Sequence, residues 1–220
     1  MRTVKVINRV ILLFVVAFIS GCGYPQLTQE DDAVISSDYT YIIGPGDSVS
    51  IFVWGNPDIS TTAHVRPDGK ITIPLAEDLL ASGKTPSQLA RVMEKSLSKY
   101  VRDPQVVIMV SGGQGVYSQQ VRVIGQLSGG STGGGGGGVS AHYSAKAFPY
   151  KKDMTLLDLI IQIGGLGQFA DGNGASIIRN IDGEPQHFGI RIDDLVDNAD
   201  LSANVKILPG DILIIPQAFF

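Results

Sequence analysis

Histidine and cysteine, the side chains that most often bind transition metals, are scarce in this chain of 220 residues. The three histidines are His64, His142 and His187, and no two of them have the spacing of a zinc-binding motif. Cys22 is the only cysteine, so it cannot take part in an internal disulfide. The sequence therefore predicts neither a metal site nor a bound cofactor.

Three further patterns could carry chemistry, but each fits a structural role better. Glu77 and Asp78 are adjacent carboxylates, and neighbouring acidic residues more often form a solvated surface than the separated pair of a glycosidase. The segment GGLGQFA at 164–170 follows an expected helix, whereas a dinucleotide fingerprint follows a strand. ADGNGAS at 170–176 lacks the closing Glu of a calcium loop and predicts a tight turn. We therefore predict that the protein is not an enzyme.

The N-terminus has the order of a bacterial lipoprotein signal. A basic region precedes an unbroken apolar stretch at 10–19, which is shorter than the ~20 residues of a membrane-spanning helix. Ile-Ser-Gly-Cys at 19–22 resembles a lipobox, in which the cysteine is acylated and becomes the first residue of the mature chain. We expect 1–21 to be a signal peptide and Cys22 to be the lipid attachment site. Gly23 in place of Asp favours sorting to the outer membrane.

The charge of the chain argues against nucleic acid as a partner. Three of the 17 basic residues and none of the 21 acidic ones precede Cys22, so the remainder has 14 basic and 21 acidic residues, a net charge of −7. Nucleic-acid binding needs clusters of Lys and Arg, and the sequence has none. Residues 26–38 are polar and acidic without periodicity, so 22–38 is expected to be an acidic tether that holds the folded part off the membrane.

An α+β unit is expected over 39–112. Apolar residues alternate along 48–53, which is typical of a half-buried strand, and further strands are expected near 70–73 and at 105–111. TPSQLARVMEKSLSKYV at 85–101 predicts a helix that begins with a capping box. One apolar stripe of this helix is expected to face the core. The stripe consists of Leu89, Val92, Met93, Leu97, Tyr100 and Val101.

A second unit is expected over 117–220. Strand patterns cover 117–127 and 177–192, and the latter contains an Asp-Gly hairpin turn. Between them, DMTLLDLIIQIGG predicts a short helix with Thr155 as its N-cap. A glycine-rich insertion at about 128–146 is expected to be a mobile loop, because consecutive glycines hold neither helix nor strand.

Turns containing Pro, Gly and Asp recur before strand patterns. Proline presets φ in such a turn, glycine takes positive φ, and the aspartate can accept hydrogen bonds from backbone N–H groups. We therefore expect these residues to be structural rather than catalytic. They are Pro45, Gly46 and Asp47, then Pro67, Asp68 and Gly69, then Pro209, Gly210 and Asp211.

Several of these motifs, in this order and behind a lipobox, resemble those of a known family. YIIGPGDSVSIFVWGNPDIS, VRPDGKITIPL and GKTPSQLARVMEKSLSKYVRDPQVVIMV resemble the polysaccharide-export domain of outer-membrane polysaccharide export lipoproteins. VRVIGQL, FPYKKDMTLLDLIIQIGGLGQFADGNGASIIR and LPGDILIIP resemble the soluble-ligand-binding β-grasp domain that follows it in that family. The resemblance implies an α+β fold with a polysaccharide-export domain at 39–112 and one β-grasp domain at 117–220.

The resemblance also implies a function. A periplasm-facing, lipid-anchored outer-membrane protein would oligomerise into a conduit that exports capsular or extracellular polysaccharide. The implied partners are the polysaccharide, an inner-membrane polysaccharide co-polymerase, further copies of the chain and the lipid bilayer. Longer members continue into an amphipathic helix that forms the outer-membrane pore. Because this chain resembles the short form found in exosortase-associated clusters, a separate outer-membrane β-barrel is an expected partner. The alternative function is that of a periplasmic carbohydrate-binding or scaffolding lipoprotein.

Overall fold

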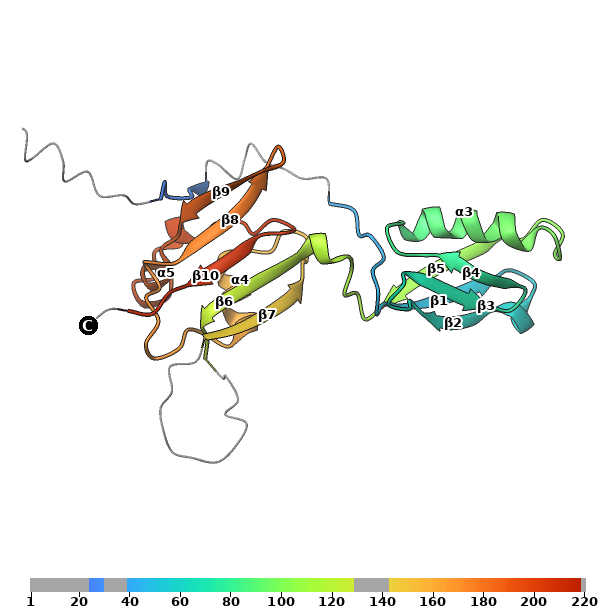
Figure 1. Ribbon diagram of the computed structural model, residues 1–220, viewed down its shortest axis with the longest axis horizontal. Coiled ribbons are helices and arrows are strands. Elements are labelled where there is room, and N and C mark those ends of the chain that lie inside the picture. Colours follow the sequence, from blue (N-terminus) through green and yellow to red (C-terminus); the bar gives the residue numbers. More distant parts are fainter. Residues whose placement is uncertain (1–23, 30–38, 129–142, 219–220) are drawn as a thin grey trace, which may run out of the picture.

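Two hydrophobic cores organise the fold. The elements around them form two separate groups in the ribbon (Figure 1). The structure is a computed structural model that describes residues 24–29, 39–128 and 143–218. We call 39–116 the first unit, and 117–218 together with 24–29 the second unit. Helices and three sheets are present in the described residues, so the α+β class predicted from the sequence is confirmed. Cys22 and most of the glycine-rich insertion lie outside the described residues.

The first unit places one helix against a three-stranded antiparallel sheet of order β2-β1-β5, beside a separate two-stranded hairpin. Along β1 the side chains alternate between buried and more exposed, as predicted, and the buried ones contribute to the same core as α3. The elements are β1 (Ser48–Val53), η1 (Pro57–Ile59), β2 (Thr61–His64), β3 (Lys70–Ile73), β4 (Ala76–Leu80), α3 (Pro86–Leu97) and β5 (Val106–Ser111).

The start of α3 is fixed by the predicted capping box. The Gln88 N–H donates to Thr85 Oγ1 at 3.2 Å, and the Thr85 N–H donates to Gln88 Oε1 at 3.0 Å. Pro86 occupies the first turn, where its missing N–H costs no intrahelical hydrogen bond. Local residue order is therefore enough to set where this helix begins.

The predicted apolar stripe of α3 is only partly buried. Leu89, Met93 and Leu97 are fully buried in the first core. The prediction was wrong for Val92 and Tyr100, which are exposed. Val92 lies at the edge of the stripe, and the helix ends at Leu97, so Tyr100 does not continue the helical face.

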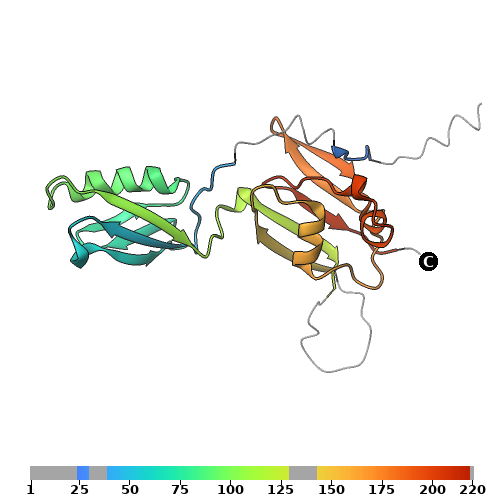
Figure 2. The ribbon, with the colours of Figure 1, turned by 180° about the vertical axis from the view of Figure 1, so that it is seen from behind.

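The second unit is a five-stranded mixed sheet of order β7-β6-β10-β8-β9, with α4 on one face (Figure 2). The central strand β10 is parallel to β6 and antiparallel to β8. The elements are η2 (Tyr117–Gln119), β6 (Gln120–Gln126), β7 (Tyr143–Pro149), α4 (Leu156–Ile163), β8 (Ser176–Ile181), β9 (Glu184–Gly189), α5 (Ile192–Asp197), η3 (Leu201–Ala203) and β10 (Ile212–Ile215).

Local signals in the second unit appear where they were predicted. Thr155 and Asp158 form a capping box at the start of α4, and Gly164 ends the helix in the left-handed conformation. The β8–β9 hairpin turns at Asp182 and Gly183, both with positive φ, as a tight hairpin turn requires.

The segment 24–29 is packed against the second unit, whereas an acidic tether was expected over 22–38. Leu27 is buried in the second core, and its N–H donates to the carbonyl of Gly189 at 3.0 Å. The Gly189 N–H in turn donates to the Pro25 carbonyl at 2.8 Å. An apolar side chain and an edge strand with free backbone groups hold this segment against the second unit.

Candidate functional site

Asp47, the aspartate of the first Pro-Gly-Asp turn, lies completely buried at the junction of the two units. Its Oδ1 accepts hydrogen bonds from the N–H groups of Gln114 at 2.7 Å and Gly115 at 3.2 Å. Its Oδ2 accepts from the Gly44 N–H at 2.8 Å and from the Tyr41 hydroxyl. The chain enters the first unit through Tyr41 and Gly44 and leaves it through Gln114 and Gly115. The carboxylate of Asp47 therefore links the segment that enters the first unit to the segment that leaves it.

Further contacts close this junction, and none of them was predicted from the sequence. Burial and the hydrogen bond to Asp47 raise the pKa of Tyr41, so its hydroxyl stays a donor. A Cβ at Gly44 would lie 1.9 Å from the carbonyl oxygen of Gly115, so only glycine allows the two passages to approach this closely. The amide of Gln119 accepts from the N–H of Ile42 at 3.2 Å.

The aspartate of the last Pro-Gly-Asp turn forms a buried ion pair. Arg179 donates to the two carboxylate oxygens of Asp211 from Nε at 3.1 Å and Nη2 at 2.8 Å. Both side chains are at most 2% exposed. The Leu208 N–H also donates to Asp211 at 2.8 Å across the turn. Asp47 and Asp211 thus both accept turn hydrogen bonds, and neither offers an exposed carboxylate for chemistry.

The middle turn carries an exposed charge cluster. Arg66 binds Asp68 at 2.6 Å and Asp78 at 2.9 Å. The hydrogen bond from Arg66 lowers the pKa of Asp68 to about 2. Gly69 takes a positive φ of 78° after Pro67, which completes the turn. Asp78 therefore forms an ion pair with Arg66 and does not form an acid–base pair with the adjacent Glu77.

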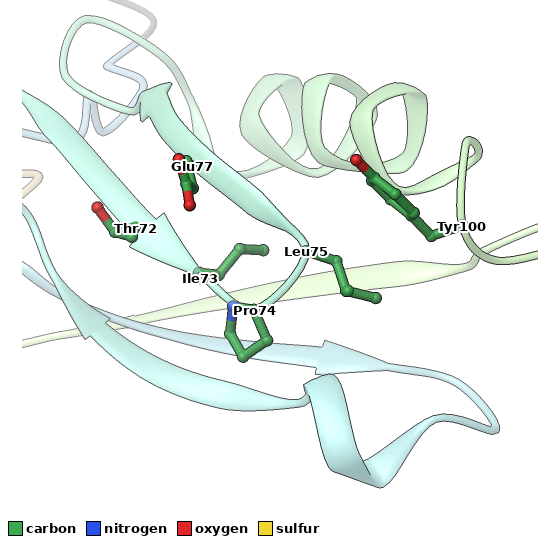
Figure 3. Close-up of a pocket in the computed structure, with 6 residues that line it drawn as sticks. All are labelled: Thr72, Ile73, Pro74, Leu75, Glu77 and Tyr100. Carbon is green, nitrogen blue, oxygen red and sulfur yellow. The ribbon is translucent and has the colours of Figure 1, made fainter.

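An open pocket of about 740 Å³ lies between the β3–β4 turn and the residues that follow α3 (Figure 3). Leu75 in the turn is 49% exposed and has a φ of +64°, a left-handed conformation that glycine usually occupies at this position. Strained backbone conformations are enriched at functional sites, so we consider the surface around Leu75 as a candidate site. The lining residues are Thr72, Ile73, Pro74, Leu75, Glu77 and Tyr100.

The pocket combines groups suited to a polyhydroxylated ligand. Tyr100 is 65% exposed and offers an aromatic face, which suits the apolar face of a sugar ring. Glu77 and Thr72 supply oxygens that accept hydrogen bonds from hydroxyl groups. Sequence reasoning missed this site although it singled out Glu77, because Tyr100 and the β3–β4 turn are brought together only by the fold.

A second exposed feature of the first unit is an apolar surface on the sheet, which we call the outer face. It consists of Phe52, Trp54, Val107 and Met109, each at least 41% exposed. Phe52 lies opposite Val107 in the β1–β5 register, and the rings of Phe52 and Trp54 meet edge to face at 6.1 Å. Clustered exposed apolar side chains are typical of a protein–protein contact surface.

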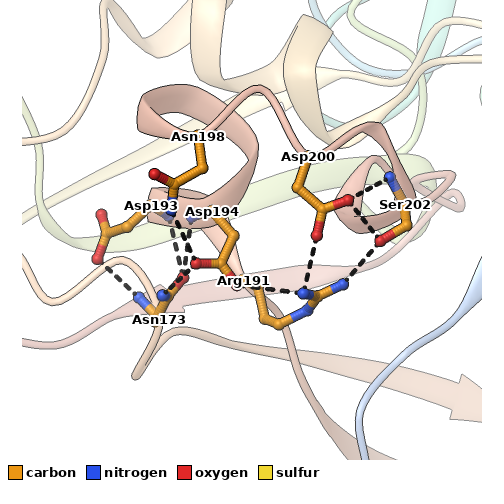
Figure 4. A network of polar contacts seen from close by, with 7 residues as sticks. All are labelled: Asn173, Arg191, Asp193, Asp194, Asn198, Asp200 and Ser202. Atoms are coloured by element: carbon orange, nitrogen blue, oxygen red, sulfur yellow. Dashed lines mark hydrogen bonds and ion pairs between the residues drawn. The ribbon is translucent and has the colours of Figure 1, made fainter.

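The segment predicted to be a tight turn at 170–176 also positions α5 (Figure 4). The side-chain oxygen of Asn173 accepts from the N–H groups of Asp193 and Asp194 at 3.1 and 3.3 Å. Because Arg191, the residue before α5, makes no side-chain cap, Asn173 supplies that cap from a distant loop. Arg191 instead bridges Asp194 and Asp200 at 3.1 and 2.9 Å. We attribute a structural role to this network.

The described residues contain neither a cluster of ligands nor a membrane-spanning element. Within 24–29, 39–128 and 143–218, no three His, Cys, Asp or Glu side chains are placed to hold a metal ion together. His64 and His187 are exposed on different units, and His142 lies outside the described residues. None of the helices in this part of the chain has the length and apolar character needed to cross a bilayer.

Residues 35–111 match the model of the family described as polysaccharide biosynthesis/export protein. This part of the chain is therefore a polysaccharide biosynthesis/export domain, and the resemblance inferred from the sequence is confirmed for these residues. The matched residues include Asp47, the pocket and the outer face. The family is one of export, which supports a role for this protein in polysaccharide export.

Proposed function

We propose that the protein is a periplasm-facing outer-membrane lipoprotein and part of an oligomeric conduit that exports capsular or extracellular polysaccharide. The observation that carries the proposal is the family match over 35–111, which covers most of the first unit. The lipobox-like sequence before Cys22 supports attachment to the membrane through an acylated cysteine. In this role the protein performs no chemistry on the polymer.

The structure offers a surface for assembly. The outer face leaves Phe52, Trp54, Val107 and Met109 exposed in the first unit, and contact with a neighbouring copy would bury them. We propose that further copies of the chain pack against this face. An inner-membrane co-polymerase and a separate outer-membrane pore protein are the proposed partners at the two ends of the conduit.

We assign the second unit to the β-grasp class of soluble-ligand-binding domains. Its chain order is hairpin, helix, hairpin and then a last strand, β10, in the centre of the sheet between β6 and β8. This arrangement supports the resemblance noted for VRVIGQL and LPGDILIIP in the sequence.

The test is a deletion strain complemented with variants. We expect loss of secreted polymer while polymer synthesis continues, because an export component acts after synthesis. Met109→Asp should lower the molecular mass of the detergent-extracted assembly and reduce export. Ile161→Asp, at an exposed aliphatic residue of the second unit, is the matched control and should change neither. A deletion strain that secretes normal amounts of polymer would contradict the proposal.

The pocket in the first unit favours a second candidate function, a carbohydrate-binding module. Exposed Tyr100, Glu77 and Thr72 provide the aromatic face and the acceptor oxygens that such a site needs. Tyr100→Ala should weaken binding of oligosaccharides of the exported polymer by about 10-fold, which is about 1.4 kcal/mol. Tyr117→Ala, at a tyrosine of equal exposure outside the pocket, is the control. Equal affinities of both variants and the unchanged protein would refute the site.

A further inference from the structure

The segment 24–29, which we call the strap, is bound along the β9 edge of the second unit. Gln26 forms a parallel bridge with Gly189, the last residue of β9. The backbone of the strap is joined to Gly189 by two hydrogen bonds, one of 3.0 Å from the Leu27 N–H and one of 2.8 Å to the Pro25 carbonyl. The strap therefore extends the sheet at its otherwise open edge.

Side chains hold the strap along its whole length. Leu27 is 6% exposed and belongs to the second core. Gln29 donates from Nε2 to the carbonyls of Leu201 and Asn204 at 2.8 and 3.2 Å. At the other end, the ring of Tyr24 stacks on His187 with ring centroids 5.1 Å apart. A buried anchor flanked by polar and aromatic contacts is the pattern of a docked segment, not of a tether.

Docking of the strap changes how far the lipid attachment point can lie from the folded protein. Cys22 precedes Tyr24 by two residues, and two residues span at most about 7 Å. A free tether over 22–38 would instead give a root-mean-square separation of about 23 Å. The second unit is therefore held much closer to the acylated residue than the composition of the N-terminal segment implies.

We propose that the strap fixes the acylated N-terminus to the β9 edge, so that this edge of the second unit lies against the lipid surface. Tyr24 is 57% exposed beside His187, and tyrosine is enriched at the level of lipid headgroups, where its ring and hydroxyl meet different surroundings. The proposal rests on the proposed function, because it takes Cys22 to be acylated. Beyond that function, the strap proposal specifies which face of the protein lies against the membrane.

The test compares two insertions that leave every strap residue in place. A flexible linker of about twelve Gly and Ser residues, with a root-mean-square length of about 19 Å, is inserted either after Gly23 or after Gln29. If the strap is docked, only the insertion after Gly23 lengthens the free chain between the lipid and the second unit. If 22–38 is a simple tether, the two insertions are equivalent.

Proximity to lipid is measured on the full lipidated protein in phosphatidylethanolamine–phosphatidylglycerol vesicles that contain a headgroup quencher. Because Cys22 is the only cysteine and is acylated, Gln186→Cys on β9 gives one thiol for a fluorescent label. Asp58→Cys, at an exposed position of the first unit, is the reference. The β9 label should be quenched in the unchanged protein and in the protein with the linker after Gln29. The linker after Gly23 should abolish this quenching.

Two further results are distinguishable. Equal quenching of the β9 and reference labels in vesicle-bound protein, or an equal effect of both insertions, would overturn the strap proposal and leave the lipoprotein proposal standing. A protein that does not float with the vesicles, or whose Cys22 thiol reacts with the label, would overturn the lipid anchor itself.

Discussion

Replacing Asp47 by alanine should destabilise the first unit and loosen its junction with the second. The carboxylate is completely buried and accepts hydrogen bonds from three backbone N–H groups and one hydroxyl. Gln114 and Tyr41 are partly accessible and can turn to water after the change. The Gly44 N–H takes part in a buried hydrogen bond and would lose its acceptor, whereas the Gly115 N–H keeps the Tyr41 hydroxyl oxygen at 3.0 Å. The buried unsatisfied Gly44 donor costs about 1–3 kcal/mol, and the hydrogen bonds of Gln114 and Tyr41 that are exchanged for water cost about 1 kcal/mol each, so we expect a loss of about 4 kcal/mol.

Asp47→Asn is a graded comparison for the same site. Its remaining oxygen can keep the bonds to Gln114 and Gly115, while its amide group would face the Gly44 N–H, donor against donor. We therefore expect a loss of about 2 kcal/mol, roughly half that of the alanine variant. Tyr41→Phe removes only the hydroxyl and should cost about 1 kcal/mol.

The assay is denaturant unfolding combined with amide hydrogen exchange at Gly44 and Gln114, which both donate to Asp47. Because the two units have separate cores, they can unfold separately, and the signal must be followed in the first unit. Exchange at both amides should accelerate in Asp47→Ala while amides in β8 keep their protection. A loss below about 1 kcal/mol with unchanged exchange at Gly44 would refute the role of the Asp47 carboxylate in holding the junction together.

Three further predictions concern the second unit. Asp211→Asn leaves the Arg179 charge buried without its counter-ion and should cost about 3–5 kcal/mol in denaturant unfolding, whereas the double change Arg179→Met with Asp211→Leu should restore most of it. Gly125→Ala would place a Cβ 1.9 Å from the carbonyl oxygen of Ile215, so this variant should lose at least about 3 kcal/mol or fail to fold. Hydrogen bonds from Thr155 lower the pKa of Asp158 from its ordinary 3.8, so its capping contribution is complete above pH 3.8 and is lost as the pH falls through the lowered value. The stability difference between the wild type and Asp158→Ala should therefore shrink on acidification, and a constant difference would contradict this assignment.

Features set by a few neighbouring residues could be predicted from the sequence. The capping boxes at Thr85 and Thr155, the hairpin turn at Asp182 and the alternation along β1 all depend on contacts within about four residues. Their energetics are local, so the same residues form the same structure in most surroundings. The family resemblance used the same local motifs in their order along the chain.

Features that join distant residues could not be predicted in this way. Asn173 caps α5 about twenty residues further on, and Gly44 is required by the approach of Gly115, which follows the last strand of the first unit. The pocket depends on Tyr100, which helical spacing assigns to the apolar stripe but which lies beyond the end of the helix. In each case the partner residue is set by the tertiary packing, and no pattern in the neighbouring sequence predicts which residue it is.

The strap shows why composition alone misjudges such segments. The stretch from 24 to 38 has the polar and acidic composition of a linker, but a short segment needs only a single well-placed apolar side chain and free backbone groups on an edge strand in order to dock. Leu27 provides the first, and Gly189 on β9 provides the second. Burying one leucine contributes about 1.5–3 kcal/mol, and two backbone hydrogen bonds add about 1 kcal/mol each. Ordering six residues costs about 1–2 kcal/mol each for the backbone alone, about 6–12 kcal/mol in all, so these terms alone do not dock the segment. The hydrogen bonds of Gln29 and the stacking of Tyr24 on His187 therefore decide whether the strap is docked. Loss of either contact should release the strap from the second unit more readily than it unfolds the unit itself.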